Sequence, residues 1–282
     1  MSRLSAPLPM AWLAALVTPL AAAACSDDDT TPGPSETPEL VSLGLESSAD
    51  LSVELLGRTN LKVGLNEVFY RVKRLPGGEL VKSAGVEQTP IMHMEAMGKE
   101  HSCPCEQPGP TADEDGLFGA LIVFQMASGM GGDAWRNEIT VDLGDGAAPQ
   151  AFVFEDLAVA ESDARKDLTL TDPMGGTTAA VVTLNFDGPL TAGQNSFTVT
   201  VHQKGDMMGM VWNPKDDLTI TATPDMPSMG HGSAGNVDPV HVEAGRYEGS
   251  VNLFMPGTWR IILGFEQGET DLGSVEYLVE IE

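Results

Sequence analysis

The stretch GLNEVFYRV, at Gly64–Val72, recurs with changed letters as GQNSFTVTV at Gly193–Val201. Both copies begin with Gly-x-Asn and continue with β-branched and aromatic residues, which is the composition of a β-strand. Similar short segments fill the chain from Leu40 to Leu143 and from Ala151 to Ile281, separated by turns that contain Gly and Pro. No window has a long helical period, so we expect an all-β protein.

More than one strand is repeated between the two halves of the chain. In the same order along both halves, the matching segments are Thr89–Met92 and Thr223–Met226, Gly116–Met126 and Gly245–Met255 (with Phe124 placed on Phe254), and Trp135-Arg136 and Trp259-Arg260. A tandem duplication of one β-sandwich explains this order. We therefore expect one sandwich at 40–146 and a second at 147–282, with the segment 151–154 as the first strand of the second.

The composition restricts the classes of partner. The chain has 282 residues, with 41 acidic residues against 15 Lys and Arg, so its formal net charge is −26. A surface of this sign repels phosphate backbones and anionic headgroups, which argues against nucleic acid and anionic lipid surfaces as partners. Hydrophobic residues make up 42% of the chain, which is enough for packed cores and argues against global disorder.

Residues 1–24 have the organisation of a secretory signal. Arg3 is followed by the apolar run Met10–Leu20 and a short alanine run, and Cys25 comes directly after them. This arrangement resembles a bacterial lipoprotein signal, in which the cysteine becomes lipidated, although Ala22 stands where leucine is usual. Secretion with a free or paired Cys25 is the alternative. Residues 25–39 are acidic and rich in Pro, Ser and Thr, and we expect them to form a disordered tether.

Soft metal donors gather in two short segments, at 92–105 and 225–231. Thioethers and thiolates are soft ligands and imidazole is borderline, a combination that suits copper, and Cu(I) especially. The segments occupy matching places in the two halves, so we expect one copper-binding loop on each sandwich. The candidate ligands are Met92, His93, Met94, Met97, His101, Cys103 and Cys105 in the first loop, and Met226, Met229 and His231 in the second.

Each candidate ligand also has a simpler interpretation. Methionines in these loops can be packing residues at the end of a sandwich, and a loop histidine can be merely solvated. If the chain is extended at 92–94, Met92 and Met94 share one face and His93 takes the other. Cys103 and Cys105 are metal ligands, a tight disulfide with each other, or paired in another way; cysteine pairs in exported proteins are more often disulfides.

Other residues are assigned from their surroundings. Trp135 and Trp259 are expected in the cores, and His202 and His241 are expected to be structural. The run Met207–Met210 (MMGM) either reaches the second site or caps the core. A calcium loop at 142–146 would lack its closing Glu, so a turn is expected there. The sequence has no Gly-x-Ser-x-Gly elbow, phosphate loop or His-Glu-x-x-His helix, so we expect no enzyme.

The segments Asp225–His231, Gly245–Val251 and Phe254–Arg260 together resemble the YtkA-like/FixH-like domain. The resemblance covers about 190–265 well and about 60–143 more loosely, because the run at 92–105 replaces the Met-Pro-x-Met-Gly-His core. It implies an immunoglobulin-like β-sandwich of exported or membrane-anchored bacterial proteins, akin to the CopC-like copper-binding domains. The expected fold class is therefore all-β, with two tandem immunoglobulin-like β-sandwiches.

These observations predict a lipid-anchored lipoprotein of the cell envelope, on the outer membrane, that binds copper for storage, delivery or tolerance. Its partners would be copper-donor or copper-acceptor proteins of the envelope, and it would contact the membrane by its lipid anchor only. The alternative is a non-catalytic structural or protein-interaction module without metal, whose Met-rich turns dock a partner. Methionine adapts easily to different partners, so composition alone does not separate the two hypotheses.

Overall fold

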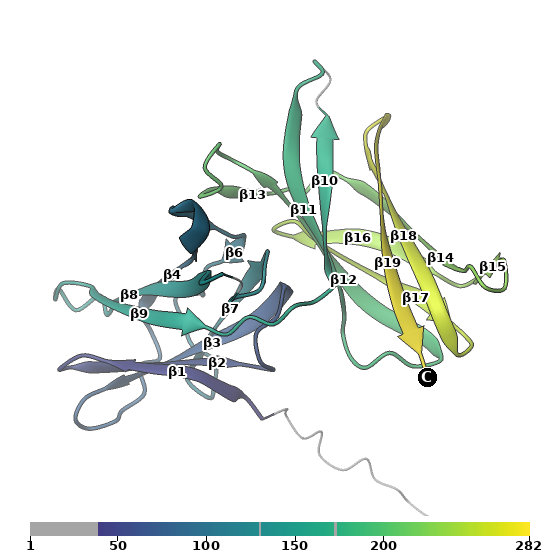
Figure 1. Cartoon of the computed structure of the whole chain (residues 1–282). Coiled ribbons are helices and arrows are strands. Elements are labelled where there is room, and N and C mark those ends of the chain that lie inside the picture. Colours follow the sequence, from purple (N-terminus) through teal and green to yellow (C-terminus); the bar gives the residue numbers. More distant parts are fainter. Residues whose placement is uncertain (1–38, 130, 172–173) are drawn as a thin grey trace, which may run out of the picture. The chain divides into compact units, whose positions relative to one another are not determined.

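The computed structural model describes residues 39–129, 131–171 and 174–282. The predicted signal segment, nearly all of the predicted tether and the predicted lipidation site Cys25 lie outside these residues. The described chain consists of β-strands joined by turns, and no helix in it is long and apolar enough to cross a membrane. Figure 1 labels most of the strands, which belong to one compact unit, Pro38–Glu282.

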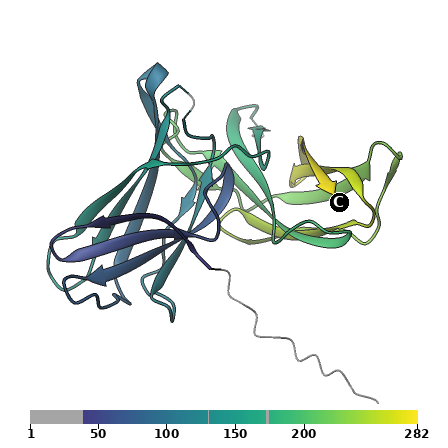
Figure 2. The same ribbon diagram turned by 60° about the horizontal axis from the view of Figure 1, so that its bottom comes forward.

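The first sandwich has two antiparallel sheets, with strand orders β1-β2-β3-β7-β6 and β5-β4-β8-β9. Its strands are β1 (Val41–Ser47), β2 (Leu51–Gly57), β3 (Gly64–Arg74), β4 (Gly85–Met94), β5 (Lys99–Ser102), β6 (Cys105–Glu106), β7 (Leu117–Phe124), β8 (Ala134–Asp142) and β9 (Gln150–Leu157). Every second residue of β8 is buried, as expected for a strand with one face on a core. Figure 2 shows these strands from another side.

The second sandwich also has two antiparallel sheets. Their orders are β10-β11-β12-β17-β16, with β13 added beside β12, and β15-β14-β18-β19. The strands are β10 (Arg165–Thr171), β11 (Thr177–Phe186), β12 (Gly193–Lys204), β13 (Trp212–Pro214), β14 (Thr219–Met226), β15 (His231–Gly232), β16 (Val237–Glu243), β17 (Arg246–Leu253), β18 (Gly257–Gln267) and β19 (Thr270–Ile281). A separate core lies between its sheets.

The two sandwiches have the same topology. Each strand of the first has a counterpart in the second in the same order along the chain, and β13 is the additional strand among the described residues. In the first sandwich β2, β3, β7 and β6 take the places of strands A, B, E and D of an immunoglobulin domain. The other sheet, β5-β4-β8-β9, has the order C′-C-F-G. The prediction of an all-β chain of two tandem immunoglobulin-like sandwiches is confirmed.

The boundary between the two sandwiches lies later in the chain than the sequence indicated. β9 contains 151–154, yet it pairs with β8, and Phe152 and Phe154 are buried in the first core. The next strand, β10, begins at Arg165 and pairs with β11. The expectation that 151–154 opens the second strand set is therefore wrong. The Gly- and Pro-containing stretch 144–150 is the connection of a β8–β9 hairpin, which has the same composition as a linker.

The strand register also corrects one detail of the repeat. Gly64 lies opposite Phe124, and Gly193 lies opposite Leu253. Phe124 therefore corresponds to Leu253 and not to Phe254, on which the letters had placed it. Phe254 lies one residue beyond the strand and is half exposed.

Asn66 explains why Gly-x-Asn recurs. Its side chain accepts a hydrogen bond from the Lys62 amide (3.0 Å) and donates to the carbonyls of Lys62 (2.7 Å) and Gly64 (2.8 Å). Asn195 makes the same three bonds to the residues four and two positions before it. Gly64 and Gly193 have φ of 102° and 117°, conformations that favour glycine. The motif thus fixes the turn that leads into β3 of the first sandwich and into β12 of the second.

A buried polar cluster distinguishes the first core from the second. The Tyr70 hydroxyl donates to Gln88 and accepts a hydrogen bond from the Asn137 amide. The Gln88 amide donates in turn to two backbone carbonyls. The register of the second sandwich places apolar residues at the three matching positions, Val199, Ala222 and Ile261. The two cores therefore share a topology but differ in polarity.

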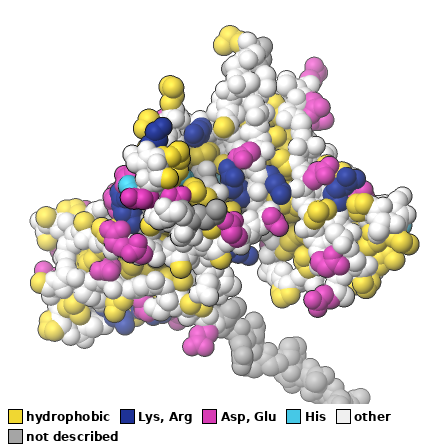
Figure 3. All heavy atoms as spheres, in the orientation of Figure 1, with side chains coloured by type: hydrophobic (Ala, Val, Ile, Leu, Met, Phe, Trp, Pro, Cys, Tyr) yellow, Lys and Arg dark blue, Asp and Glu magenta, His cyan; other side chains and the backbone are white. Residues whose placement is uncertain are grey.

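The charged side chains are spread over the surface. Figure 3 shows acidic and basic groups interspersed with apolar ones on one face of the molecule. Many of the basic groups pair with carboxylates, as Arg71 does with Glu54 (2.9 Å) and Arg260 with Asp225 (2.8 Å). Such exposed pairs each contribute about 0–1 kcal/mol, so the two buried cores carry most of the stability.

Candidate functional site

The first candidate segment is a strand hairpin at its start, where a loop was expected. Met92–Met94 forms the end of β4, a 3₁₀ turn covers Glu95–Met97, and β5 begins at Lys99. Gly98 closes the turn with φ 55°, in the left-handed region that favours glycine. The candidate residues are therefore held in register by the C–C′ hairpin of the sandwich.

Met92 lies between a histidine and a tryptophan on the neighbouring strands. It is directly opposite His101 on β5 and directly opposite Trp135 on β8. Side chains that are opposite one another share a sheet face, with Cβ atoms about 4.5–5.5 Å apart. The His101 and Trp135 rings meet edge to face, with their centroids 5.5 Å apart. The structure thus brings Met92 and His101 together, beside a core tryptophan.

The second hairpin repeats this arrangement. Met226 at the end of β14 is directly opposite His231 on β15. The register of β14 with β18 places Trp259 beside Met226, and the His231 and Trp259 ring centroids are 6.2 Å apart. His231 also stacks on Phe254, with centroids 5.7 Å apart and an interplanar angle of 21°. A Met–His pair against a tryptophan is therefore a shared property of both sandwiches.

The two histidines are oriented by equivalent hydrogen bonds. His101 Nδ1 lies 2.9 Å from the Ser102 carbonyl oxygen, and His231 Nδ1 lies 3.1 Å from the Gly232 carbonyl oxygen. A carbonyl only accepts, so Nδ1 must carry the proton in both rings. In the neutral ring the lone pair is then on Nε2. Histidine ligands in metal sites are oriented in this way, with one nitrogen donating to a carbonyl and the other left for the metal.

His93 is not part of this arrangement. It lies on the opposite face of β4 from Met92 and Met94, as the strand alternation predicted. Its Nε2 lies 3.2 Å from Glu95 and its Nδ1 lies 3.6 Å from Glu100. Its ring therefore faces Glu95 and Glu100 and is turned away from the thioethers of Met92 and Met94.

The candidate methionines fall into two groups. Met92 and Met226 are fully buried core residues, and Met94 packs against the first core. Met97 and Met229 are mostly exposed, at the turns of the two hairpins. The packing interpretation is therefore correct for Met92 and Met226. Burial does not remove the thioether from the site, because each of the two residues lies opposite its histidine.

Both cysteines are free thiols in the structure. Cys103 is buried in the first core, and burial holds its pKa well above the usual range, with the neighbouring Cys105 as a smaller cause. Burial also raises the pKa of Cys105 to about 11. Thiols that stay protonated at neutral pH are weak ligands and poor nucleophiles. Of the candidate residues in this segment, Met92 and His101 are therefore better placed as soft donors than the cysteines.

Arginines form ion pairs with the carboxylates next to each hairpin. Arg136 contacts Glu100 (2.7 Å) and Glu138 (2.8 Å), and Arg260 forms a bidentate pair with Asp225 (2.9 and 2.8 Å). These arginines hold the pKa values of Glu100 and Asp225 below the usual range. Within the described residues no group of three or more His, Cys, Asp and Glu side chains could hold a metal ion. A metal at these hairpins would have to use methionine.

Three further sequence assignments can be located. The run Met207–Met210 lies next to His101 of the first sandwich, and so neither of its two expected places is correct. His202 is buried within β12, and His241 contacts Asp216 at 2.9 Å. Neither histidine is near a candidate methionine in the strand register.

Sequence reasoning placed both tryptophans in the cores, which is correct, but it missed their contacts with the histidines. Trp135 and Trp259 are fully buried, and their indole N–H groups donate to the carbonyls of Met126 (2.8 Å) and Met255 (3.0 Å). The signal was present in the repeat, which keeps the Trp-Arg pair in both halves. It could have been used only with the strand register, because the two residues are far from the histidines along the chain.

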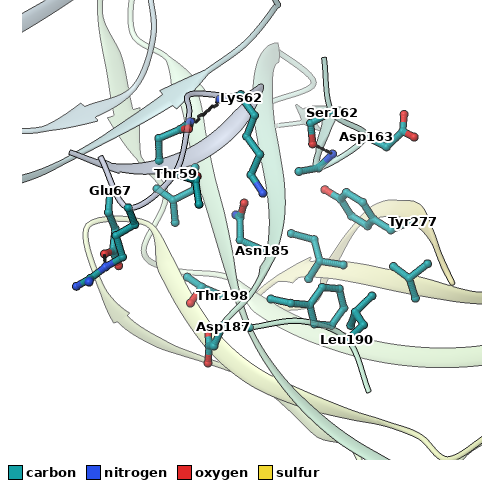
Figure 4. Close-up of a pocket in the computed structure, with 18 of the residues that line it drawn as sticks. Thr59, Lys62, Glu67, Ser162, Asp163, Asn185, Asp187, Leu190, Thr198 and Tyr277 are labelled. Atoms are coloured by element: carbon teal, nitrogen blue, oxygen red, sulfur yellow. Dashed lines mark hydrogen bonds and ion pairs between the residues drawn. The ribbon is translucent and has the colours of Figure 1, made fainter. Parts of the chain in front are cut away.

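One hollow in the protein surface lies away from both hairpins. It has a volume of about 580 Å³ and is lined by Lys62, Asn185, Thr198 and Tyr277, among others (Figure 4). Figure 4 shows the Lys62 side chain extending toward Asn185. No Met, His or Cys occurs among the described residues that line this hollow. It is therefore unrelated to the predicted soft-metal chemistry.

Residues 174–264 match the YtkA-like family model. The match runs from the turn between β10 and β11 through most of β18, and it includes Met226, His231 and Trp259. The match lies wholly within the second sandwich, so the looser resemblance at 60–143 stays a prediction.

Two solved structures are similar over most of the chain. The S-layer protein SbsC, domains 5–6, has a TM-score of 0.31 and 11% identity, covering 86% of this chain and 99% of that one. The titin Ig tandem domains A164–A165 have a TM-score of 0.19 and 9% identity, covering 84% and 98%. No curated protein matches. These likenesses are too remote to carry an argument, so the immunoglobulin-like assignment beside the YtkA-like match rests on strand order.

Proposed function

We propose that this protein binds Cu(I) at two sites, one on each sandwich, formed by Met92 with His101 and by Met226 with His231. The observation that supports this most is the repeated hydrogen bond from the histidine Nδ1 to the next carbonyl. It assigns the same tautomer twice and leaves Nε2 with its lone pair, on the residue directly opposite a methionine.

The donor set favours copper over the commoner metals. A thioether and a neutral imidazole are soft to borderline donors without charge, a combination that suits Cu(I). Calcium and magnesium require several oxygen ligands, whereas the nearest carboxylates, Glu100 and Asp225, are held by Arg136 and Arg260. A structural zinc site needs four ligands, usually from Cys and His. Neutral ligands leave the positive charge of Cu(I) in place, and a protein with a net charge of −26 attracts such a cation.

The proposed role is to hold or hand over the ion, and not catalysis. Each methionine is buried on the core face of its sheet while the histidine is only half buried, so the ion would enter from the histidine side. The signal-like segment 1–24 and Cys25 favour a lipid-anchored protein of the cell envelope. Its partners would then be proteins that donate copper to the site or accept copper from it.

The test is a Cu(I) titration of the chain without residues 1–24, under reducing conditions, against a competing Cu(I) chelator. We expect two ions per chain. His101→Asn and His231→Asn should each remove one ion, because asparagine keeps a donor for the carbonyl but has no equivalent of Nε2. His93→Asn is the matched control, and it should leave both sites intact because His93 lies on the other face of β4, beside Glu95 and Glu100.

The outcomes separate the two functions. Loss of binding in His93→Asn with retention in His101→Asn would place the site on the wrong face of β4 and refute the assignment. Absence of binding above the chelator's background in the unsubstituted protein would refute the copper function. That result would leave the hypothesis of a structural or protein-interaction module.

A further inference from the structure

The run Met207–Met210 belongs to a hairpin that is longer than its counterpart in the first sandwich, where a single bridge joins Lys73 to Leu80. The hairpin joins β12 to β13, the additional strand of the second sandwich, with Lys204 opposite Trp212. Its turn is organised by Asp206, whose carboxylate accepts hydrogen bonds from the amides of Gly209 (2.6 Å) and Met210 (2.9 Å). The segment therefore has a defined backbone conformation, although it carries three methionines.

This turn lies against the first candidate site. The Ser102 amide donates to the Gly209 carbonyl (3.0 Å), which adds a backbone bond beside β5. The Trp212 indole N–H lies 3.2 Å from the Ser102 carbonyl and 3.1 Å from the Gly209 carbonyl. The Ser102 carbonyl is the same group that accepts from His101 Nδ1. One carbonyl thus connects the candidate ligand to the second sandwich.

Gly209 is close to the histidine itself. A Cβ atom placed on Gly209 would be 3.6 Å from the His101 Cβ, so the backbone of the turn passes directly beside the side chain. Gly209 has φ 76°, which favours glycine at this position. Met208 and Met210 flank Gly209 in the chain, so both side chains start from the turn that passes beside His101.

The exposure of these methionines is not explained by core packing. Met207 is 98% exposed, Met208 is 65% exposed and Met210 is 39% exposed. Met207 extends into solvent, whereas Met210 is partly covered. Apolar side chains of this size at a turn contribute little to stability, and thioethers next to a histidine are soft donors beside a proposed soft-metal site.

We infer that Met208 and Met210 supply thioether ligands to the first copper site, which is therefore formed by both sandwiches. The inference rests on the proposed function at Met92 and His101. It makes the two sites unequal, because the histidine of the second site, His231, stacks on Phe254. The first site would hold Cu(I) more tightly, with a higher ratio of sulfur to nitrogen ligands.

The experiment isolates the first site by using the His231→Asn variant as the background. In that background we compare Met208→Leu/Met210→Leu with Met207→Leu, by competition with a Cu(I) chelator. Leucine keeps the apolar volume and removes only the sulfur, so folding is preserved. We expect the double variant to lose about tenfold or more in Cu(I) affinity, a change of about 1.4 kcal/mol or more. Met207→Leu should have no effect.

X-ray absorption at the copper edge gives the second measurement, because the double variant should show fewer sulfur ligands. Unchanged affinity and an unchanged sulfur count in the double variant would overturn the inference and leave the proposed function standing. An equal loss in Met207→Leu would also overturn it, since Met207 is too exposed to be a ligand. If the unsubstituted protein binds no Cu(I), the proposed function and this inference both fail.

Discussion

Acidification should destabilise the protein through one buried histidine. His202 on β12 is 5% exposed, and its Nδ1 has no hydrogen-bond partner among the described residues. Burial lowers the pKa of His202 from 6.5 to about 4, against a smaller opposing effect of the Asp216 carboxylate. The folded protein therefore keeps this ring neutral down to about pH 4, while the unfolded chain takes up the proton at about pH 6.5.

The sign of the effect follows from proton uptake. Between pH 6.5 and 4 the unfolded state binds more protons than the folded state at His202, so the free energy of unfolding falls as pH falls. The decrease is about 1.4 kcal/mol per pH unit and about 3 kcal/mol in total. The full contribution is present above pH 6.5, and the loss stops below about pH 4. A side chain so little exposed needs no correction for solvent screening.

Urea unfolding at pH 7, 5.5 and 4 measures this directly. The comparison with His202→Gln removes the effect of the carboxylates, which titrate in both proteins. We expect the difference in the free energy of unfolding between the two proteins to change by about 3 kcal/mol from pH 7 to pH 4. The same pH dependence in both proteins would show that His202 is solvated in the folded state. His241→Gln is the control, because His241 is partly exposed beside Asp216.

Three further expectations follow. Asn66→Ala and Asn195→Ala should each lower the free energy of unfolding by about 1–3 kcal/mol, because each leaves buried backbone groups unpaired. Chemical denaturation measures this, and a neutral effect of either variant would contradict the repeated role. Met226→Ala should cost about 2–5 kcal/mol and Met229→Ala at most about 0.5 kcal/mol, a contrast that thermal unfolding would reveal. Cys103 should react with a thiol reagent only after unfolding, and rapid labelling of the native protein would show that its thiol is not buried as described.

The fold was largely predictable from local patterns. Segments with alternating or β-branched residues, such as 117–124 and 197–202, became strands close to where they were expected. The strand β10 was missed because its polar residues, from Arg165 to Thr171, alternate with only two buried leucines. The error at 151–154 arose because a hairpin connection and a linker between domains have the same Gly, Ala and Pro composition.

The candidate site was predictable in part. Period-two alternation separated His93 from Met92 and Met94, and the structure confirms that separation. The partner of each methionine was not predictable, because the residue opposite Met92 depends on the length of the turn before β5. Nδ1 of His101 carries the proton because it lies next to the Ser102 carbonyl, and that contact depends on the backbone conformation of the hairpin. The strand partner of Met92 and the tautomer of His101 are set by the geometry of the folded backbone, which local sequence patterns do not reveal.

The buried cluster of Tyr70, Gln88 and Asn137 has a consequence for how the chain reaches its folded state. Two sandwiches of one topology on one chain offer each strand two similar sheets to join, and misassembly between repeats is a common fault of such proteins. A strand carrying Gln88 or Asn137 that entered the second sandwich would meet apolar neighbours and leave a buried amide unpaired, at about 1–3 kcal/mol for each. The polar cluster thus favours the correct pairing of these strands, because their pairing in the second sandwich would cost free energy.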